Sequence, residues 1–212
     1  MTGARQIGPT DVLLAVDVQN DFCSGGALAV PGGEDVVAPV NALLARFSNA
    51  VLTQDWHPAG HSSFASSHAG RRPYETVEAE YGQQVLWPDH CVRGTRGAAF
   101  HPALEVDRAQ LILRKGFHPK IDSYSAFYEN DRTTPTGLSA YLRERGLSRI
   151  VICGLATDFC VAWSALDARR HGFDVLIVTD ACRAIDLDGS LAAAMGEMNE
   201  AGVQPVASHD LV

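Results

Sequence analysis

The stretch IVICGLATDFCVAW, residues 150–163, contains both kinds of element from which the rest of the chain is built. Its first three residues are β-branched and its fourth is apolar, which is typical of a buried strand. A turn that contains glycine follows, and from Thr157 onward the sequence resembles the start of a helix. A buried strand that leads into a helix predicts a parallel sheet with helices on its faces.

The same alternation of apolar runs and helical patterns continues along the chain. Strands are predicted at residues 12–16, 50–53, 111–113, 150–153, 175–178 and 203–207. Helices are predicted within residues 34–49, 134–146, 157–172 and 188–202. No repeat or linker interrupts the pattern. We therefore expect one domain over residues 1–212, a three-layer α/β/α fold of the Rossmann type with a six-stranded, mainly parallel sheet.

Two long segments depart from this alternation, residues 54–110 and residues 115–135. Both have much loop-like sequence, and together they contain six of the eight histidines. Long irregular segments are uncommon in compact domains unless they have a function. We therefore expect functional groups in these segments, although plain surface loops are the alternative interpretation.

The composition excludes several classes of protein. The chain has 212 residues, 46% of them hydrophobic, and a formal net charge of -8, which argues against nucleic acid or an anionic membrane as the main partner. No apolar run is as long as a membrane span, and the first residues, MTGARQIGPTD, lack the apolar core of a secretory signal. We expect a cytoplasmic protein. Its five cysteines include no C-x-x-C pair, so neither a disulfide framework nor a zinc–cysteine cluster is expected.

Chemically active residues follow four of the predicted strands. Asp17, Asp55 and Lys115 stand at the ends of the first three strands, and Cys160 follows the fourth after a short turn. The carboxyl ends of parallel strands lie at one edge of a sheet, where ligands bind. Two carboxylates, an ammonium group and a thiol are therefore predicted to meet there.

Cys160 is the candidate nucleophile. With Thr157 or Asp158 as the helix N-cap, its thiol lies in the first helical turn, where unpaired N–H groups and the helix dipole lower a thiol pKa and can hold an oxyanion. Asp17 could accept the thiol proton, and Lys115 could stabilise the resulting charge. The alternative is that Cys160 is simply buried, as most free cysteines are. We accept that interpretation for Cys153, in mid-strand. Cys91 and Cys182 are also expected to be inert, and so is Cys23, although it could lie near the site.

A second cluster has the composition of a metal site. Asp55 and His57 are two residues apart in an extended segment, and His90 comes from the far end of the long loop. One carboxylate and two imidazoles suit Zn, Fe or Mn, with His61 as a candidate further ligand. Histidines in loops often have no such role. Three aromatic side chains could form an apolar pocket beside the cluster or simply pack in the core: Phe22, Trp56 and Trp87.

Five motifs, in order along nearly the whole chain, resemble the nicotinamidases of the isochorismatase-like hydrolase superfamily. They are VDVQNDFCSGGALAVPGG (16–33), QDWHPAGHSSFA (54–65), WPDHCVRGTRGAAFHP (87–102), RKGFHPKIDSYSAF (114–127) and GLATDFCV (154–161). The last motif alone would indicate only the superfamily. All five together are specific for the nicotinamidases, and no triad or metal position departs from the pattern.

The resemblance implies roles for individual residues. It implies a catalytic triad of Asp17, Lys115 and Cys160, and one divalent metal ion held by Asp55, His57 and His90. It further implies an oxyanion hole from the N–H groups of Ala156 and Cys160, a cis peptide bond before Ala156, and contacts to the pyridine ring from Phe22, Trp87 and Tyr124. The fourth metal position varies among relatives, so His61 is left undecided.

The implied reaction is hydrolysis of nicotinamide to nicotinate and ammonia through a cysteine thioester, with pyrazinamide as a second substrate and NAD salvage as the role. The implied partner is a small molecule, nicotinamide. Neither nucleic acid nor a membrane is expected as a partner, and whether the chain forms a homo-oligomer is left open. The alternatives are a sister amidohydrolase for carbamoyl or ureido compounds, a true isochorismatase, a mechanism with metal-bound water as nucleophile, and an inactive binding protein. The metal set and the intact triad disfavour the first and last of these.

Overall fold

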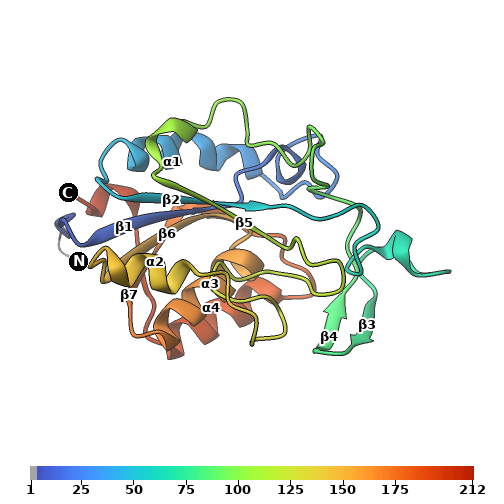
Figure 1. The fold of residues 1–212 in the computed structure, drawn as a ribbon. Coiled ribbons are helices and arrows are strands. Elements are labelled where there is room, and N and C mark those ends of the chain that lie inside the picture. The colour runs from blue at the N-terminus through green and yellow to red at the C-terminus, as the bar shows by residue number, and fades with distance from the viewer. Residues whose placement is uncertain (1–3) are drawn as a thin grey trace.

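The structure, a computed structural model, describes residues 4–212 (Figure 1). The expectation that the first residues lack a secretory signal depends in part on residues 1–3, which lie outside this range. The central sheet has six strands, all parallel, in the spatial order β5-β2-β1-β6-β7-β8. Numbered within this sheet, the order is 3-2-1-4-5-6, which is that of the Rossmann fold. The strands are β1 (Asp11–Val16), β2 (Ala50–Asp55), β5 (Leu111–Lys115), β6 (Arg149–Leu155), β7 (Asp174–Arg183) and β8 (Gln204–Val206).

All six predicted strands are therefore confirmed. Every residue of β1 and β2 is buried, as are the last six residues of β6. Continuous burial explains the apolar runs within these strands, since helices cover both faces of the sheet. The largest difference is at β7, which is ten residues long because it continues past its apolar run into a polar segment.

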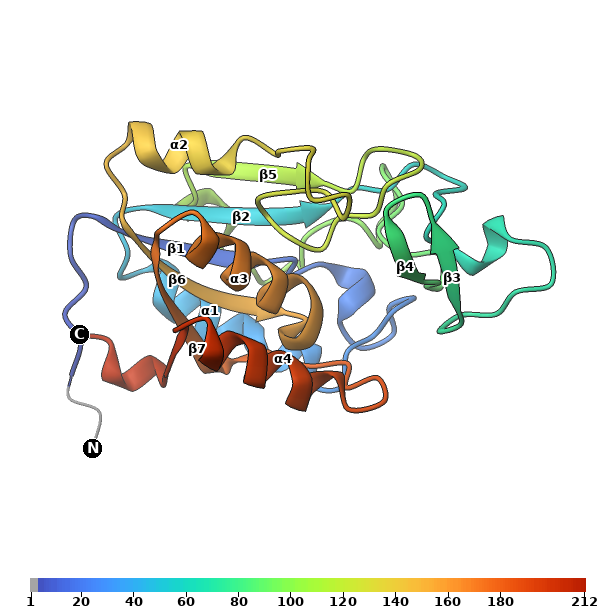
Figure 2. The same ribbon diagram turned by 90° about the horizontal axis from the view of Figure 1, so that it is seen from below.

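Four helices form the outer layers (Figures 1 and 2). Helix α1 (Val37–Leu44) covers one face of the sheet, while α2 (Leu138–Glu144), α3 (Ala162–Arg170) and α4 (Ser190–Glu200) lie on the other. The layers therefore confirm the predicted α/β/α architecture. Each helix is shorter than its predicted segment because turns occupy the ends. A 3₁₀ turn, Gly33–Val36, precedes α1 at the position of the early helical pattern.

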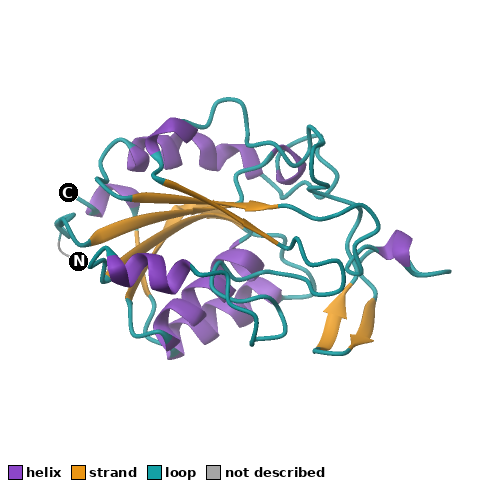
Figure 3. Cartoon of the chain, in the orientation of Figure 1, coloured by secondary structure: helices purple, strands orange, loops and turns teal. Residues whose placement is uncertain are grey.

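One element was not predicted. Strands β3 (Thr76–Ala79) and β4 (Gly82–Val85) form an antiparallel hairpin apart from the main sheet. Each strand has four residues, and most are exposed or half-buried, so neither produces an apolar run that could be recognised in the sequence. Figures 2 and 3 place this hairpin and the long loops at the end of the sheet where β1, β2 and β5 terminate. Within residues 4–212 there is no helix of the length and apolarity needed to cross a membrane.

Gly154 allows β6 to approach β1 closely just before the site. Its φ is +113°, and the β6–β7 pairing is irregular between Ile152 and this residue. A Cβ at Gly154 would overlap the backbone of Val16, the last residue of β1. Any side chain would therefore push apart the two strands whose ends carry Asp17 and the turn containing Cys160.

We predict that Gly154→Ala destabilises the fold much more than Gly82→Ala. Both glycines have φ of +113°, but a Cβ at Gly82 would meet nothing within 4 Å. The free energy of unfolding of the control, Gly82→Ala, should fall only by the strain of an alanine at positive φ, about 1–2 kcal/mol. Gly154→Ala adds overpacking, so its free energy of unfolding should fall by roughly 3 kcal/mol or more. Urea unfolding of both variants measures this difference, and equal losses would contradict the importance of the close approach.

Candidate active site

The structure brings the four predicted side chains together at the carboxyl edge of the sheet. Asp17 directly follows β1, Asp55 and Lys115 are the last residues of β2 and β5, and Cys160 lies in the turn after β6. Asp55 and Lys115 are register partners in the parallel β2–β5 pair. The strand order reverses between β1 and β6, and this reversal is where open α/β sheets bind ligands.

The ammonium group of Lys115 is the centre of this cluster. The side chain is fully buried, and Nζ lies 2.9 Å from Asp17 Oδ2 and 2.5 Å from Asp55 Oδ1. Nζ also donates to the carbonyl oxygen of Ser123 at 2.8 Å and lies 3.4 Å from Cys160 Sγ. A buried ammonium needs such partners because an unpaired charge in the interior is very costly.

Two polar side chains that the sequence analysis did not identify hold Asp17 and Asp55 in place, the first through its carboxylate and the second through its backbone. Thr53 Oγ1 donates to Asp17 Oδ1 at 2.6 Å and accepts the Asp17 N–H at 3.1 Å. The amide of Gln19 accepts the Asp55 N–H at 2.8 Å and donates to the Asp55 carbonyl at 2.9 Å. Gln19 lies two residues after Asp17 in the VDVQNDF segment, and this proximity was the only signal available in the sequence.

The expectation of a lowered pKa for the Cys160 thiol was wrong. Burial raises the pKa of Cys160 well above its usual range; Lys115 opposes this effect, but the Asp17 and Asp55 carboxylates add to it. Burial also raises the pKa of Asp17, although Lys115 and Thr53 oppose it. The resting pair is therefore a neutral thiol beside a carboxylate that is more basic than usual.

The segment that carries Cys160 also differs from the prediction. Thr157–Val161 is a π-helical turn that leads into α3, and its N-cap is Ala156, not Thr157 or Asp158. Instead, the buried Asp158 carboxylate holds the loop after β7. It accepts hydrogen bonds from the N–H groups of Ile185 (3.0 Å) and Asp186 (2.7 Å) and from Ser190 Oγ (2.5 Å).

The backbone before Cys160 presents a free donor. The Leu155–Ala156 peptide bond is cis, as the resemblance implied. Within residues 4–212, no group accepts a hydrogen bond from the Ala156 N–H. Ala156 and Cys160 both line the cavity described below. An N–H group without a protein acceptor, next to the thiol, can bind an oxygen atom of a ligand.

A small cavity with several aromatic side chains in its walls adjoins the thiol. Its lining includes the three predicted ring contacts, Phe22, Trp87 and Tyr124, and four residues that were not predicted, Leu28, Asp122, Phe159 and Ile185. Its volume is 20 Å³, so the side chains of its walls lie close together. Trp56 does not line it, because its ring packs 3.9 Å from the guanidinium carbon of Arg114.

The predicted metal ligands also meet, at the Oδ2 atom of Asp55, whereas Lys115 contacts Oδ1. Ligand atoms of Asp55, His57 and His90 lie within 4.8 Å of one another, and all three residues are buried. The Nε2 atoms of His57 and His90 lie 3.5 and 3.8 Å from Asp55 Oδ2. Asp122 Oδ1 lies 4.0 Å from His57 Nε2 and adds a second carboxylate nearby.

Hydrogen bonds determine which nitrogen of each imidazole is free. His57 Nδ1 lies 2.8 Å from the Gly116 carbonyl oxygen, and His90 Nδ1 lies 2.8 Å from that of Pro88. Since a carbonyl only accepts, Nδ1 of each ring carries a proton, and in the neutral imidazole Nε2 then presents a lone pair. The buried Nε2 of His57 has no hydrogen-bond partner among the described residues. Two converging lone pairs and a carboxylate fit a divalent cation.

His61 does not complete this set. Its Nε2 lies 2.8 Å from the His118 carbonyl oxygen and therefore carries the proton. Its Nδ1 lies 2.8 Å from Ser63 Oγ and accepts the Ser63 N–H at 3.2 Å. Both nitrogens are thus engaged with protein groups, which favours a set of three protein ligands.

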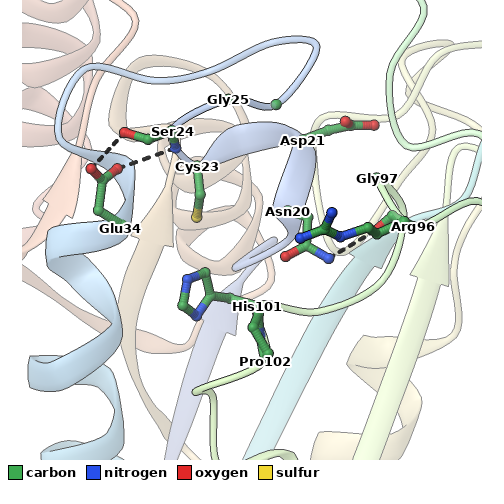
Figure 4. A pocket seen from close by; sticks show the side chains of 11 residues that line it. Asn20, Asp21, Cys23, Ser24, Gly25, Glu34, Arg96, Gly97, His101 and Pro102 are labelled. Atoms are coloured by element: carbon green, nitrogen blue, oxygen red, sulfur yellow. Dashed lines mark hydrogen bonds between the residues drawn. The ribbon is translucent and has the colours of Figure 1, made fainter.

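The remaining cysteines lie outside the cluster. Cys153 is fully buried in β6, and burial raises the pKa of its thiol well above the usual range. Cys23 lines a separate surface pocket of 540 Å³ (Figure 4), which contains none of the predicted triad or metal residues. Burial and the nearby Glu34 carboxylate raise the pKa of Cys23 to about 11, so it is a poor nucleophile near neutral pH.

Comparison with known proteins agrees with this geometry. Residues 11–210 match the family model of the isochorismatase domain. A nicotinamidase of Acinetobacter baylyi is 54% identical over 200 residues, covering 94% of this chain and 94% of that protein.

Solved structures are also similar over nearly the whole chain. A nicotinamidase–pyrazinamidase of Acinetobacter baumanii has a TM-score of 0.95 at 54% identity, covering 96% of this chain and 98% of its own. PnC1 of L. infantum, in complex with nicotinate, has a TM-score of 0.86 at 39% identity, covering 99% and 98%. A pyrazinamidase of Pyrococcus horikoshii, in complex with zinc, has a TM-score of 0.76 at 36% identity, covering 94% and 99%. The chain belongs to the isochorismatase family, within which it groups with the nicotinamidases and pyrazinamidases.

Proposed function

We infer that this chain is an amidohydrolase that converts nicotinamide to nicotinate and ammonia, accepts pyrazinamide as well, and serves NAD salvage. The observation that carries the inference is the contact of one buried ammonium, Lys115 Nζ, with Asp17, Asp55 and Cys160. It places a thiol, a base and a cation in a single cluster. The 54% identity to a nicotinamidase assigns the substrate class.

Cys160 is the nucleophile and Asp17 is its base. The thiol proton passes to the Asp17 carboxylate as Sγ attacks the carboxamide carbon, so no free thiolate is needed in the resting enzyme. Lys115 stays protonated, because burial lowers its pKa but Asp17 and Asp55 more than offset this and raise it well above the usual range. Its positive charge stabilises the negative charge that moves from Asp17 toward the substrate.

The tetrahedral intermediate is held by backbone donors. The N–H groups of Ala156 and Cys160 bind its oxyanion, and the unpartnered Ala156 N–H supports this assignment. Protonated Asp17 returns its proton to the leaving nitrogen, and ammonia departs as the thioester forms. Water, deprotonated by Asp17, then attacks the thioester carbon; the C–S bond breaks and releases nicotinate and the Cys160 thiol.

Asp55, His57 and His90 would hold one divalent ion, Zn, Fe or Mn, and the zinc-bound pyrazinamidase supports zinc among these. When bound, the ion supplies a Lewis acid for the pyridine nitrogen and so orients the carboxamide. Gly116 keeps His57 in place for this task. Its carbonyl fixes the imidazole, and a Cβ there would lie 2.5 Å from His57 Cε1.

Release of ammonia from nicotinamide by the purified protein tests the proposal directly. A carbamoyl or ureido hydrolase would leave nicotinamide intact, and an inactive binding protein would bind it without turnover. If nicotinamide is not hydrolysed by metal-loaded protein, the proposed function is wrong.

The first prediction concerns the nucleophile. Cys160→Ala should lower kcat by at least about three orders of magnitude, since no other nucleophile is offered. Cys153→Ala, at a buried cysteine outside the cluster, is the matched control and should keep near wild-type activity with some loss of stability. Initial rates of ammonia release measure both variants. Substantial residual activity in Cys160→Ala would instead favour direct attack by water.

The second prediction concerns the cation. Lys115→Met should raise the pKa of Cys160 and slow its alkylation about tenfold at a fixed pH below that pKa, because an ammonium favours the thiolate. Lys120→Met, at an exposed position, should leave the rate unchanged. Mass spectrometry of the peptide that contains Cys160 follows the modification over pH. Identical profiles for the two variants would show that Lys115 does not act on the thiol.

The third prediction separates the metal from the thiol. Nicotinamide should be hydrolysed far faster than benzamide, which has the same shape without the ring nitrogen, and His57→Ala or chelation should erase most of this preference. Alkylation of Cys160 should continue in the chelated protein. Comparing kcat/KM for the two amides with and without metal tests this. Equal slowing of both amides, or loss of alkylation, would place the metal at the reacting carbon.

A further inference from the structure

The β3–β4 hairpin has one buried polar side chain, which contacts residues that line the cavity. The hairpin lies outside the main sheet (Figure 2), and most of its residues are exposed or half-buried. Gln84 on β4 is only 2% exposed, whereas the preceding Gln83 points to solvent. A polar side chain is buried to this extent only where its hydrogen bonds are satisfied, so its partners indicate what it does.

The Gln84 amide joins two walls of the cavity. Its Nε2, which carries two hydrogens, lies within hydrogen-bond distance of three acceptors: Asp122 Oδ2 at 2.8 Å, the Tyr124 hydroxyl at 3.2 Å and the Val85 carbonyl oxygen at 2.7 Å. Its Oε1 accepts from the Tyr81 hydroxyl at 2.9 Å and from Asn130 Nδ2 at 3.4 Å. Asp122 and Tyr124 line the cavity beside Cys160, but Gln84 does not.

These bonds set the orientation of both wall side chains. Asp122 Oδ2 is held by Gln84 and Oδ1 by the Ser123 N–H at 2.8 Å, which leaves Oδ1 4.0 Å from His57 Nε2. The Tyr124 hydroxyl accepts from both Gln84 and Trp87 Nε1, the latter at 3.0 Å. Trp87 and Tyr124 are two of the three proposed ring contacts, and Gln84 supports the wall that they form by holding the Tyr124 hydroxyl.

We propose that Gln84 is a positioning residue for substrate binding, which acts through Tyr124 and Asp122 and couples the hairpin to the shape of the ring pocket. This inference rests on the proposed function. Gln84 touches neither the thiol nor the reacting carbon, so its loss should weaken binding of the ring and leave the nucleophile intact. Truncating it would leave the buried Asp122 Oδ2 without its donor and the Tyr124 hydroxyl with Trp87 Nε1 alone, a cost that favours displacement of both side chains.

The test compares Gln84→Met with Gln83→Met, the same substitution one residue earlier on the solvent face of the same strand. For Gln84→Met, the KM for nicotinamide should rise about tenfold, with kcat changed less than about threefold. Alkylation of Cys160 by a small reagent should proceed at the wild-type rate, and tryptophan fluorescence should change because Tyr124, the hydrogen-bond partner of Trp87 Nε1, is no longer held by Gln84. Gln83→Met should match wild type in all four readouts.

A milder variant covers the case in which Gln84→Met folds poorly. Tyr81→Phe removes only the hydroxyl that donates to Gln84 Oε1 and accepts the Asp122 N–H at 3.3 Å. It should raise KM by a smaller factor, again with kcat and alkylation preserved. Wild-type KM in Gln84→Met, or parallel losses of kcat, alkylation and thermal stability in both variants, would overturn the proposal. Wild-type protein that fails to hydrolyse nicotinamide would instead refute the proposed function.

Discussion

The architecture of the site depends on a single buried ammonium group. Lys115 is fully enclosed, and two carboxylates from neighbouring strands, Asp17 and Asp55, satisfy its charge. Removing one partner from a buried ion pair typically costs about 3–5 kcal/mol, so these three side chains must be present together. Their positions at the ends of β1, β2 and β5 make the parallel sheet a requirement of the chemistry, because only adjacent strand ends bring them within contact.

Asp55 connects the two halves of the site. One of its oxygens, Oδ1, meets Lys115, while Oδ2 faces the imidazoles of His57 and His90. A single carboxylate therefore shares its charge between the Lys115 ammonium and the two imidazoles of the proposed metal site. Burial would raise the pKa of Asp55, but Lys115 and His57 outweigh it and hold this pKa well below the usual range. The carboxylate stays ionised, as both tasks require.

The walls of the site come from segments that the sheet does not contain. The loop after β1 supplies Phe22, the segment after β4 supplies Trp87, and the segment after β5 supplies Tyr124. The hairpin amide of Gln84 and the carboxylate of Asp158 fasten the surrounding loops from outside the cavity. The sheet thus determines the positions of Asp17, Asp55, Lys115 and Cys160, whereas side-chain hydrogen bonds between loops determine the space available to a ligand.

The sequence by itself determined the six main strands, the α/β/α layers and the convergence of Asp17, Asp55, Lys115 and Cys160. These follow from local rules, since apolar runs report burial and strand ends in a parallel sheet share one edge. Only the tertiary structure decided the pKa of Cys160, because burial and neighbouring carboxylates outweigh the helix terminus that the sequence suggested. It also decided the contacts of Gln19, Thr53 and Gln84 with the site, because their hydrogen bonds to Asp55, Asp17, Asp122 and Tyr124 span 36 to 40 residues of the chain. No local pattern encodes such partners, because they are brought together only when the whole chain folds.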